Sequence, residues 1–252
     1  MTTNAWFAPA TKGLAMATTP HYRLLSFDLD GTLVDTASEI AEAANRALAA
    51  HGIARRPVKE ITHLIGAGAH ELMRRLLARV FQESPRLADS VEVAAVLASM
   101  DEHYAVTTGS SAVPYGGCRE TLQQLRAAGV HLACTTNKEM RHARRVLEVT
   151  RLDRYFDLVV GGDTLPEKKP HASVLRHVAA TLQVGVDHCA HVGDSAVDVQ
   201  AARNAGMAAW AVPYGYNAGV PIADARPDRL FKTLPEVAEH VLLRYAPAPN
   251  RP

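Results

Sequence analysis

The sequence is poor in cysteine and aromatic residues and carries almost no net charge. Its 252 residues include 3 Cys and 6% aromatic residues, and 27 Lys and Arg nearly balance 26 Asp and Glu. The charge balance excludes a strongly basic nucleic-acid binder, and a hydrophobic content of 48% excludes a largely disordered chain. No apolar run approaches the ~18 residues of a membrane span. We therefore expect a globular protein with neither a nucleic-acid partner nor a membrane segment.

The cysteines exclude a disulfide framework. Cys118, Cys134 and Cys189 are odd in number, widely spaced and without a C-x-x-C pair, which is typical of proteins in a reducing compartment. We therefore expect a cytoplasmic protein. Cys134 and Cys189 each lie in an apolar run, which favours buried hydrophobic residues over catalytic thiols.

Neither end of the chain predicts regular structure. Pro9 and Gly13 interrupt the first residues, and no basic segment precedes an apolar core, so a secretory signal is disfavoured. We expect residues 1–21 to form a disordered extension, with Met16 as an alternative start to Met1. The proline-rich residues 246–252 are expected to form a disordered tail.

Short apolar runs alternate with helical segments along most of the chain. We predict five of these runs to be strands, at residues 23–27, 131–135, 158–160, 189–192 and 208–212. Strands buried on both faces lose the alternation of polar and apolar residues, so these continuous runs indicate a parallel sheet covered by helices on both sides. The sequence therefore predicts an α/β fold with a Rossmann-like core, formed by residues 22–35 and 113–245.

The first two predicted strands are separated by about a hundred residues, far more than an ordinary connection. Thr36 and Glu39 match a capping box that would begin a helix. A second helix is predicted over residues 69–81, and residues 84–85, Ser-Pro, are suited to begin a third. Residues 36–112 are therefore predicted to form an inserted all-helical cap domain.

Two acids, Asp28 and Asp30, follow the first predicted strand directly. The two-residue period of a strand points them the same way. Neighbouring buried carboxylates repel each other unless a cation or a shared proton offsets their charge, which favours a metal site. The alternative is a pair of turn-forming acids before Gly31.

A second pair of acids, Asp194 and Asp198, follows a later strand. Asp194 is the better candidate for a metal ligand, because no cap motif explains it. Asp198 is either a ligand or supporting residue of such a site or, together with Ser195, the cap of a helix.

Hydroxyl, amide and lysine side chains follow two further strands. Thr136 and Asn137 precede a predicted helix, where backbone N–H groups favour an anion, although an ordinary helix cap explains the same residues. Lys168 and Lys169 precede Pro170, which suits the first turn of another helix. Solvated loop lysines are the alternative interpretation there.

These groups each follow a different strand, and the carboxyl ends of parallel strands meet in one crevice. Acids, a hydroxyl and a lysine together suit phosphoryl transfer, in which positioning and charge neutralisation dominate. A hard cation held by few carboxylates indicates Mg²⁺. P-loop and G-x-S-x-G motifs are absent. Gly66 and Gly68 are interpreted as part of a turn between helices rather than as a ligand loop.

Taken together, these motifs resemble the haloacid dehalogenase superfamily of phosphatases and, within it, the bacterial phosphoglycolate phosphatases. The resemblance spans residues 22–239. It is carried, in family order, by FDLDGTLVDT (27–36), CTTNK (134–138), GGD (161–163), EKKPH (167–171), GDSAVDVQAARNAG (193–206) and PYGYN (213–217).

The resemblance implies hydrolysis of 2-phosphoglycolate to glycolate and phosphate through an aspartyl-phosphate. Asp28 would be the nucleophile, and Asp30 would act as general acid and then general base. Thr136, the Asn137 backbone and Lys169 would bind the phosphoryl group.

The resemblance also implies a metal site, and it leaves a second candidate for the phosphate-binding lysine. Asp28, the Asp30 carbonyl and Asp194 would bind Mg²⁺, and Asp198 would support the site. Lys168 is the less favoured substitute for Lys169.

Other activities remain open in the sequence. Dehalogenases of the superfamily lack the second acid, present here as Asp30, so that activity is disfavoured. A phosphatase or phosphomutase for another small phosphorylated metabolite, such as a sugar phosphate, is the main alternative. The remote alternative is a non-catalytic phosphate-metabolite sensor that binds partners through Arg141, Arg144 and Arg145, which the complete set of acids and lysine disfavours.

We expect the helical insert to determine which substrate is bound. The insert would close over the crevice as a mobile cap. A glycolate carboxylate would need a cation there. Arg74, Arg75 and His63 are the candidates, although arginines on a surface are the commoner case.

Overall fold

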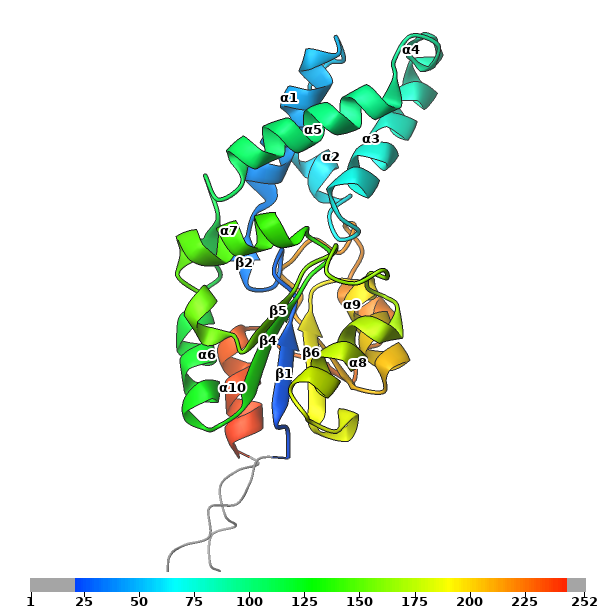
Figure 1. The fold of residues 1–252 in the computed structure, drawn as a ribbon. Coiled ribbons are helices and arrows are strands. Elements are labelled where there is room, and N and C mark those ends of the chain that lie inside the picture. Colours follow the sequence, from blue (N-terminus) through cyan, green and yellow to red (C-terminus); the bar gives the residue numbers. More distant parts are fainter. Residues whose placement is uncertain (1–20, 244–252) are drawn as a thin grey trace, which may run out of the picture.

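The computed structural model describes residues 21–243. At its centre lies a six-stranded parallel sheet in the order β5-β4-β1-β6-β7-β8 (Figure 1). The strands are β1 (Leu24–Phe27), β4 (His131–Thr135), β5 (Leu158–Val160), β6 (Cys189–Gly193), β7 (Ala208–Ala211) and β8 (Arg229–Leu230). The predicted α/β fold is therefore confirmed. The short edge strand β8 was not predicted, because its two residues carry no apolar run.

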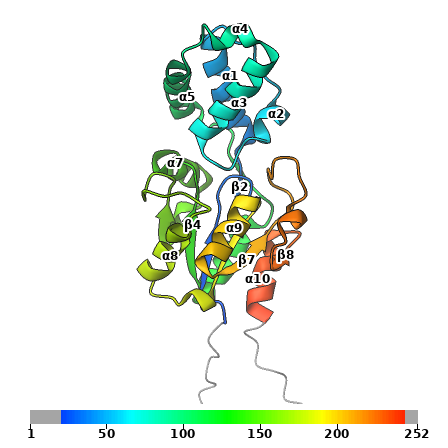
Figure 2. The same cartoon turned by 90° about the vertical axis from the view of Figure 1, so that its right-hand side faces the viewer.

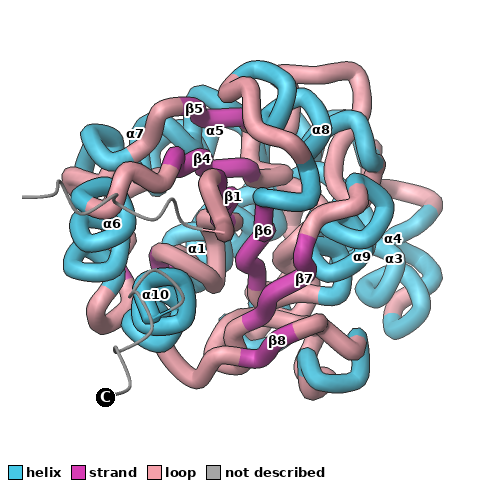
Figure 3. Tube along the Cα trace, turned by 90° about the horizontal axis from the view of Figure 1, so that it is seen from below, coloured by secondary structure: helices cyan, strands magenta, loops and turns pink. Residues whose placement is uncertain are grey.

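Helices cover both faces of the sheet (Figure 3). One face carries α6 (Cys118–Ala127), α7 (Met140–Thr150) and α10 (Leu234–Leu243), and the other carries α8 (Ala172–Thr181) and α9 (Ala196–Ala205). Three single 3₁₀ turns lie at Asp153–Tyr155, Val186–His188 and Ile222–Ala225. None of the helices within residues 21–243 has the length and apolarity that a membrane crossing needs.

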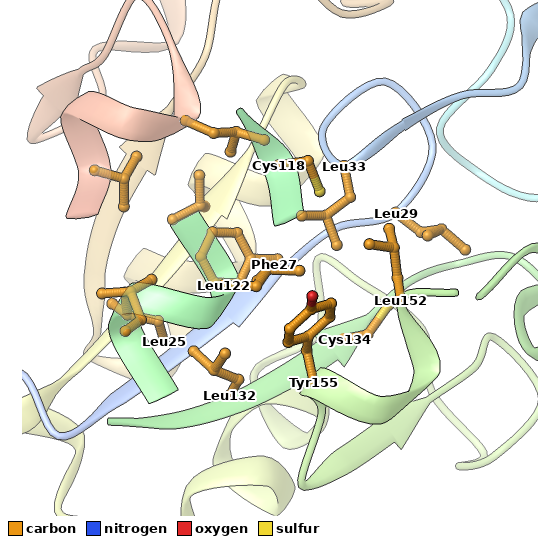
Figure 4. Packing of buried hydrophobic residues seen from close by; sticks show 14 of the residues in the cluster. Leu25, Phe27, Leu29, Leu33, Cys118, Leu122, Leu132, Cys134, Leu152 and Tyr155 are labelled. Carbon is orange, nitrogen blue, oxygen red and sulfur yellow. The ribbon is translucent and has the colours of Figure 1, made fainter. Parts of the chain in front are cut away.

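Successive side chains of β1 enter opposite apolar clusters, as the period of a strand requires. Leu25 and Phe27 pack in the cluster beneath α6, α7 and α10, whereas Leu24 packs beneath α8 and α9. Figure 4 shows Phe27 beside Leu122 of α6. Both faces of the sheet are therefore buried, which explains the continuous apolar runs of the sequence.

The three cysteines lie in this core as free thiols. Burial raises the pKa of Cys118 to about 12 and that of Cys189 to about 11. Burial also raises the pKa of Cys134, which is wholly inaccessible to solvent. A thiol reacts as its thiolate, so the prediction of buried hydrophobic residues is confirmed.

Five helices lie beyond the carboxyl-terminal ends of the strands (Figures 1 and 2). They are α1 (Ala37–Ala50), α2 (Val58–Thr62), α3 (Ala69–Glu83), α4 (Pro85–Ala88) and α5 (Val93–Thr107). The antiparallel strands β2 (Val34–Asp35) and β3 (Val113–Pro114) form the two connections to the sheet. These helices bury an apolar cluster of their own, to which Leu72, Leu76 and Val80 contribute.

The expected capping box at the start of α1 is wrong. Thr36 makes no cap hydrogen bond with its side chain and instead donates to Asp30 Oδ1 over 2.6 Å. Glu39 Oε2 accepts hydrogen bonds from the backbone N–H groups of Gly109 (2.9 Å) and Ser111 (3.4 Å). Both side chains are buried and find partners on other segments, and these tertiary contacts replace the local cap.

Two other details of the helix starts also differ from the sequence prediction. The helix expected after Ser84 is the single turn α4, and Ser84 provides no cap hydrogen bond with its side chain. Pro170 lies ahead of α8 rather than in its first turn, because the imidazole of His171 accepts a hydrogen bond from the backbone N–H of Ser173 and caps that helix. The predicted terminal extension and tail fall outside the described residues, except for His21.

Candidate active site

The carboxyl end of β1 places two acids at a cavity beneath the helices. Asp28 and Asp30 both line this cavity, together with Thr136, Asn137 and Lys138 from the loop after β4. Its opposite wall comes from α1, α3, α5 and the turn before α3. The structure thus brings together the residues that follow β1 and β4. They meet at the edge of the sheet where parallel strands open a crevice.

Three buried carboxylates gather beside this cavity. Oxygen atoms of Asp28, Asp194 and Asp198 all lie within 4.8 Å of one another. Asp194 accepts hydrogen bonds from Thr32 Oγ1 (3.0 Å) and from the backbone N–H of Tyr216 (2.6 Å). Burial, together with the charges of Asp198 and Asp28, raises the pKa of Asp194 well above its usual value.

Asp198 caps α9, as one of its two sequence interpretations predicts, and it also contacts two residues outside the cap. Its Oδ2 accepts hydrogen bonds from the Ser195 hydroxyl (2.6 Å) and backbone N–H (3.1 Å), which completes a capping box at α9. Its Oδ1 contacts Lys169 Nζ at 2.7 Å and His191 Nε2 at 3.1 Å. Burial alone would raise the pKa of Asp198, but Lys169 and His191 hold it below its usual range.

Of the two adjacent lysines, only Lys169 reaches the carboxylates. It is 4% exposed, and its Nζ lies 3.0 Å from Asp28 Oδ1 and 2.7 Å from Asp198 Oδ1. Burial opposes its charge, yet the neighbouring Asp198 and Asp28 raise its pKa above the usual value. Lys168 is exposed. The structure therefore favours Lys169 over Lys168 as the cation of the site.

The carboxylate cluster fits a divalent metal ion. With all three carboxylates ionised, Lys169 leaves a net charge of −2 among fully buried groups. Burial raises the pKa of Asp28 to about 7, against the pull of Lys169, which shows the cost of this uncompensated charge. Carboxylate oxygens are the ligands of hard cations. A divalent cation held by Asp28 and Asp194 would offset this charge.

Two glycines, Gly31 and Gly215, make room for Asp194, a role that the sequence prediction did not assign to either of them. A Cβ atom at Gly31 or Gly215 would collide with the Asp194 carboxylate. Gly31 also has a φ of +84°, which side-chain-bearing residues rarely adopt. The glycine that follows Asp30 therefore does more than form a turn, because it admits a carboxylate from another strand.

Asn137 contributes its side chain as well as its backbone. The amide Nδ2 donates to the carbonyl oxygens of Gly66 (3.0 Å) and Lys169 (2.9 Å). The amide Oδ1 accepts from the backbone N–H of Lys169 at 2.9 Å. The turn between α2 and α3 that contains Gly66 and Gly68 thus lies against the site and lines its cavity.

Lys138 is a further residue of the site that sequence reasoning missed. Its buried Nζ lies 2.8 Å from Asp30 Oδ1 and 5.0 Å from the centre of the Tyr104 ring. Burial opposes its charge, but Asp30 and Tyr104 raise its pKa. The Thr36 hydroxyl binds the same oxygen of Asp30. Two donors therefore fix the orientation of the Asp30 carboxyl group.

The three candidate cations, of which one was expected to bind the glycolate carboxylate, lie in different places. Arg75 is exposed and pairs with Glu71 at 2.7 Å. His63 lies against Gly219, in a separate cavity. Arg74 lines a cavity that it shares with Asn137 and Lys168. Of the three, only Arg74 lies in a cavity next to the site.

The fold and this arrangement are those of a known enzyme class. The family model for haloacid dehalogenase-like hydrolases matches residues 22–206, and the chain belongs to this family. A phosphoglycolate phosphatase from Thiobacillus denitrificans is 37% identical over 211 residues, which are 84% of this chain and 92% of that protein. A plasmid-encoded phosphoglycolate phosphatase from Cupriavidus necator is 42% identical over 75% of this chain and 80% of its own length.

Solved structures agree with this relationship. The crystal structure of a predicted phosphoglycolate phosphatase from Haemophilus somnus superposes with a TM-score of 0.81 at 29% identity. The match covers 87% of this chain and 98% of that chain. The fold predicted from the sequence and the family resemblance are therefore confirmed.

Proposed function

We propose that the protein is a Mg²⁺-dependent phosphatase that hydrolyses 2-phosphoglycolate to glycolate and phosphate. The broader activity, hydrolysis of a phosphoric monoester, follows from the family of the chain together with its phosphoglycolate phosphatase relatives. One observation carries the finer proposal. Asp28 lies at the meeting point of a buried carboxylate cluster, a buried lysine and the cavity that also receives Asp30. The names of the relatives supply the substrate.

In this proposal Asp28 attacks the phosphorus atom and the bond to the ester oxygen breaks. Asp30 gives a proton to the departing oxygen, and then takes one from the water that hydrolyses the aspartyl-phosphate. Lys169 neutralises charge on the phosphoryl oxygens, and Thr136 and the Asn137 backbone orient them. The bound metal ion would neutralise further charge on the phosphoryl group.

The metal ligands in this proposal are Asp28, the Asp30 carbonyl and Asp194, with Asp198 as support. Asp198 is already bound to Lys169 and His191 through one oxygen and to Ser195 through the other. Those contacts favour a supporting role, in which Asp198 holds Lys169 beside Asp28.

The helices α1–α5 act as the cap in this proposal, and residues 36–112 remain the predicted cap domain. The turn before α3 lies against Asn137, and helices of the segment form one wall of the cavity. Substrate would therefore meet both the sheet edge and the helices. The buried free thiols support a cytoplasmic location.

Phosphate release tests the proposal directly. We expect the purified protein to release phosphate from 2-phosphoglycolate in the presence of Mg²⁺ and to lose this activity with a chelator. We also expect Mg²⁺ to raise the melting temperature, because a cation bound only by the folded carboxylate cluster stabilises that state. Values of kcat/KM across a panel of small phosphomonoesters rank the substrates. Full activity in chelator, or a much higher kcat/KM for a sugar phosphate, would contradict the proposal.

Arg74 is the residue on the helices that we expect to attract the glycolate carboxylate. Replacement of Arg74 by Ala should raise KM for 2-phosphoglycolate roughly threefold to tenfold and leave kcat nearly unchanged, because a cation in the cavity next to the site contributes binding in ground and transition states alike. Arg75→Ala is the matched control, since Arg75 is exposed and pairs with Glu71. Equal KM values for the two variants would reject this role of Arg74.

A further inference from the structure

His142 is a buried side chain of the cavity that the proposed reaction does not use. It lies in the first turn of α7, is 4% exposed and lines the same cavity as Asp28 and Asp30. Its ring packs against the ring of Tyr104, with centroids 4.3 Å apart and an interplanar angle of 31°. The imidazole is therefore held in place by α5 at the wall of the cavity that the substrate would enter.

The hydrogen bonds of Thr108 decide which nitrogen of this imidazole carries the proton. Thr108 Oγ1 lies 2.6 Å from the carbonyl oxygen of Tyr104 and 2.9 Å from His142 Nδ1. An oxygen pair at 2.6 Å needs a proton between the atoms, and only the hydroxyl has one to give. The Thr108 hydroxyl therefore donates to Tyr104, and it accepts from Nδ1–H of His142. In the neutral imidazole, Nε2 is then an acceptor.

No residue within the described range 21–243 satisfies that acceptor. His142 Nε2 is buried and has no hydrogen-bond partner. The nearest charged group, Glu139 Oε2, is 3.9 Å away and accepts a hydrogen bond from Arg141. Burial, with the nearby charges of Arg141 and Lys138, lowers the pKa of His142 to about 4, so the ring is neutral at pH 7. A buried acceptor without a partner is costly, and a ligand that supplies a donor removes the cost.

We propose that His142 Nε2 accepts a hydrogen bond from a hydroxyl group on the organic part of the substrate. The enzyme would accordingly also hydrolyse phosphate monoesters of small hydroxyl-bearing molecules, and would prefer each of them to the otherwise identical ester that lacks the hydroxyl. A carboxylate is not the partner, because its oxygens have no proton to give. The wall from Ile40, Ile65 and Leu72 is apolar. Two acidic acceptors that also line the cavity already receive hydrogen bonds, Asp30 from Lys138 and Glu139 from Arg141.

This inference rests on the phosphomonoesterase activity of the site but not on 2-phosphoglycolate as its substrate. Two pairs of substrates test it, each differing only in hydroxyl groups: 2-hydroxyethyl phosphate against ethyl phosphate, and glycerol 3-phosphate against propyl phosphate. We expect the wild-type kcat/KM to favour the hydroxyl-bearing member of at least one pair by roughly threefold to tenfold, the value of one net hydrogen bond. The absence of a preference in both pairs would overturn the inference, whatever the activity toward 2-phosphoglycolate.

Three variants connect the preference to the imidazole. His142→Phe keeps the ring and removes the acceptor, so the ratio within the preferred pair should fall to about one. Thr108→Val removes the hydroxyl that accepts from Nδ1–H, so Nε2 is no longer fixed as the acceptor. This variant should lower the same ratio. Arg145→Ala, at an exposed position of α7, is the control and should leave it unchanged. Because each ratio is measured within one variant, a loss of folded protein cancels. An unchanged ratio in His142→Phe would overturn the inference.

Discussion

Replacement of Asp28 by Asn is expected to lower kcat for phosphate release by about 10³-fold or more, whichever phosphomonoester is used. The amide cannot form the acyl-phosphate, and loss of a nucleophile removes the reaction path rather than one contact. The change is nearly isosteric, and burial, which raises the pKa of Asp28 to about 7, shows that a charged group is disfavoured at this position. We therefore expect the folded protein to tolerate the substitution.

The control for Asp28→Asn is Asp153→Asn, which makes the same chemical change at an exposed position of a 3₁₀ turn. Phosphate release by this control should equal that of the wild type. Melting temperatures of both variants show whether either has unfolded. A folded Asp28→Asn protein with substantial turnover would contradict the role of Asp28 as nucleophile.

Replacement of Lys169 by Met is expected to reduce both stability and activity. Its ammonium group is the only cation within 4 Å of Asp28 among the described residues, and it also pairs with Asp198. Removing one partner of a buried ion pair leaves an uncompensated charge and typically costs about 3 to 5 kcal/mol of folding free energy. We expect a loss of this size in urea denaturation without metal, and a fall in kcat of about 10²-fold or more.

Lys168→Met is the matched control, because the two lysines are adjacent and only Lys169 is buried. An exposed substitution of this kind usually changes the folding free energy by less than about 0.5 kcal/mol. Mg²⁺ should restore part of the stability of Lys169→Met, because a cation held by Asp28 and Asp194 offsets some of the charge that the lost lysine leaves in the cluster. Similar losses in the two lysine variants would contradict the assignment of Lys169 as the cation of the site.

The sheet and the position of the site could be predicted because both depend on local patterns. Strands β4 and β5 have the predicted bounds, since strands buried on both faces must be apolar throughout. Asp28, Thr136 and Asp194 each stand directly after a strand, β1, β4 and β6 respectively. Parallel pairing then brings strand ends that are distant in sequence to one edge of the sheet.

Other features depend on contacts between segments and leave no local pattern. Thr36 and Glu39 look like a helix cap, but the fold offers them partners near residues 30 and 110. Lys138 reads as a loop lysine until the fold places it beside Asp30. The fit of Gly215 around Asp194 is equally invisible, because a glycine gives no sign of which side chain will approach it.

The hydrogen bonds of Asn137 divide the site into a permanent part and a separable part. Two of them bind Lys169, which like Asn137 belongs to the part of the molecule that contains the sheet. The third reaches Gly66, in the turn between α2 and α3. If helices α1–α5 swing outward to admit substrate, Asn137 loses only its hydrogen bond to Gly66. The groups that perform the chemistry then stay assembled while the entrance opens, so each catalytic cycle begins from a ready-made reaction centre.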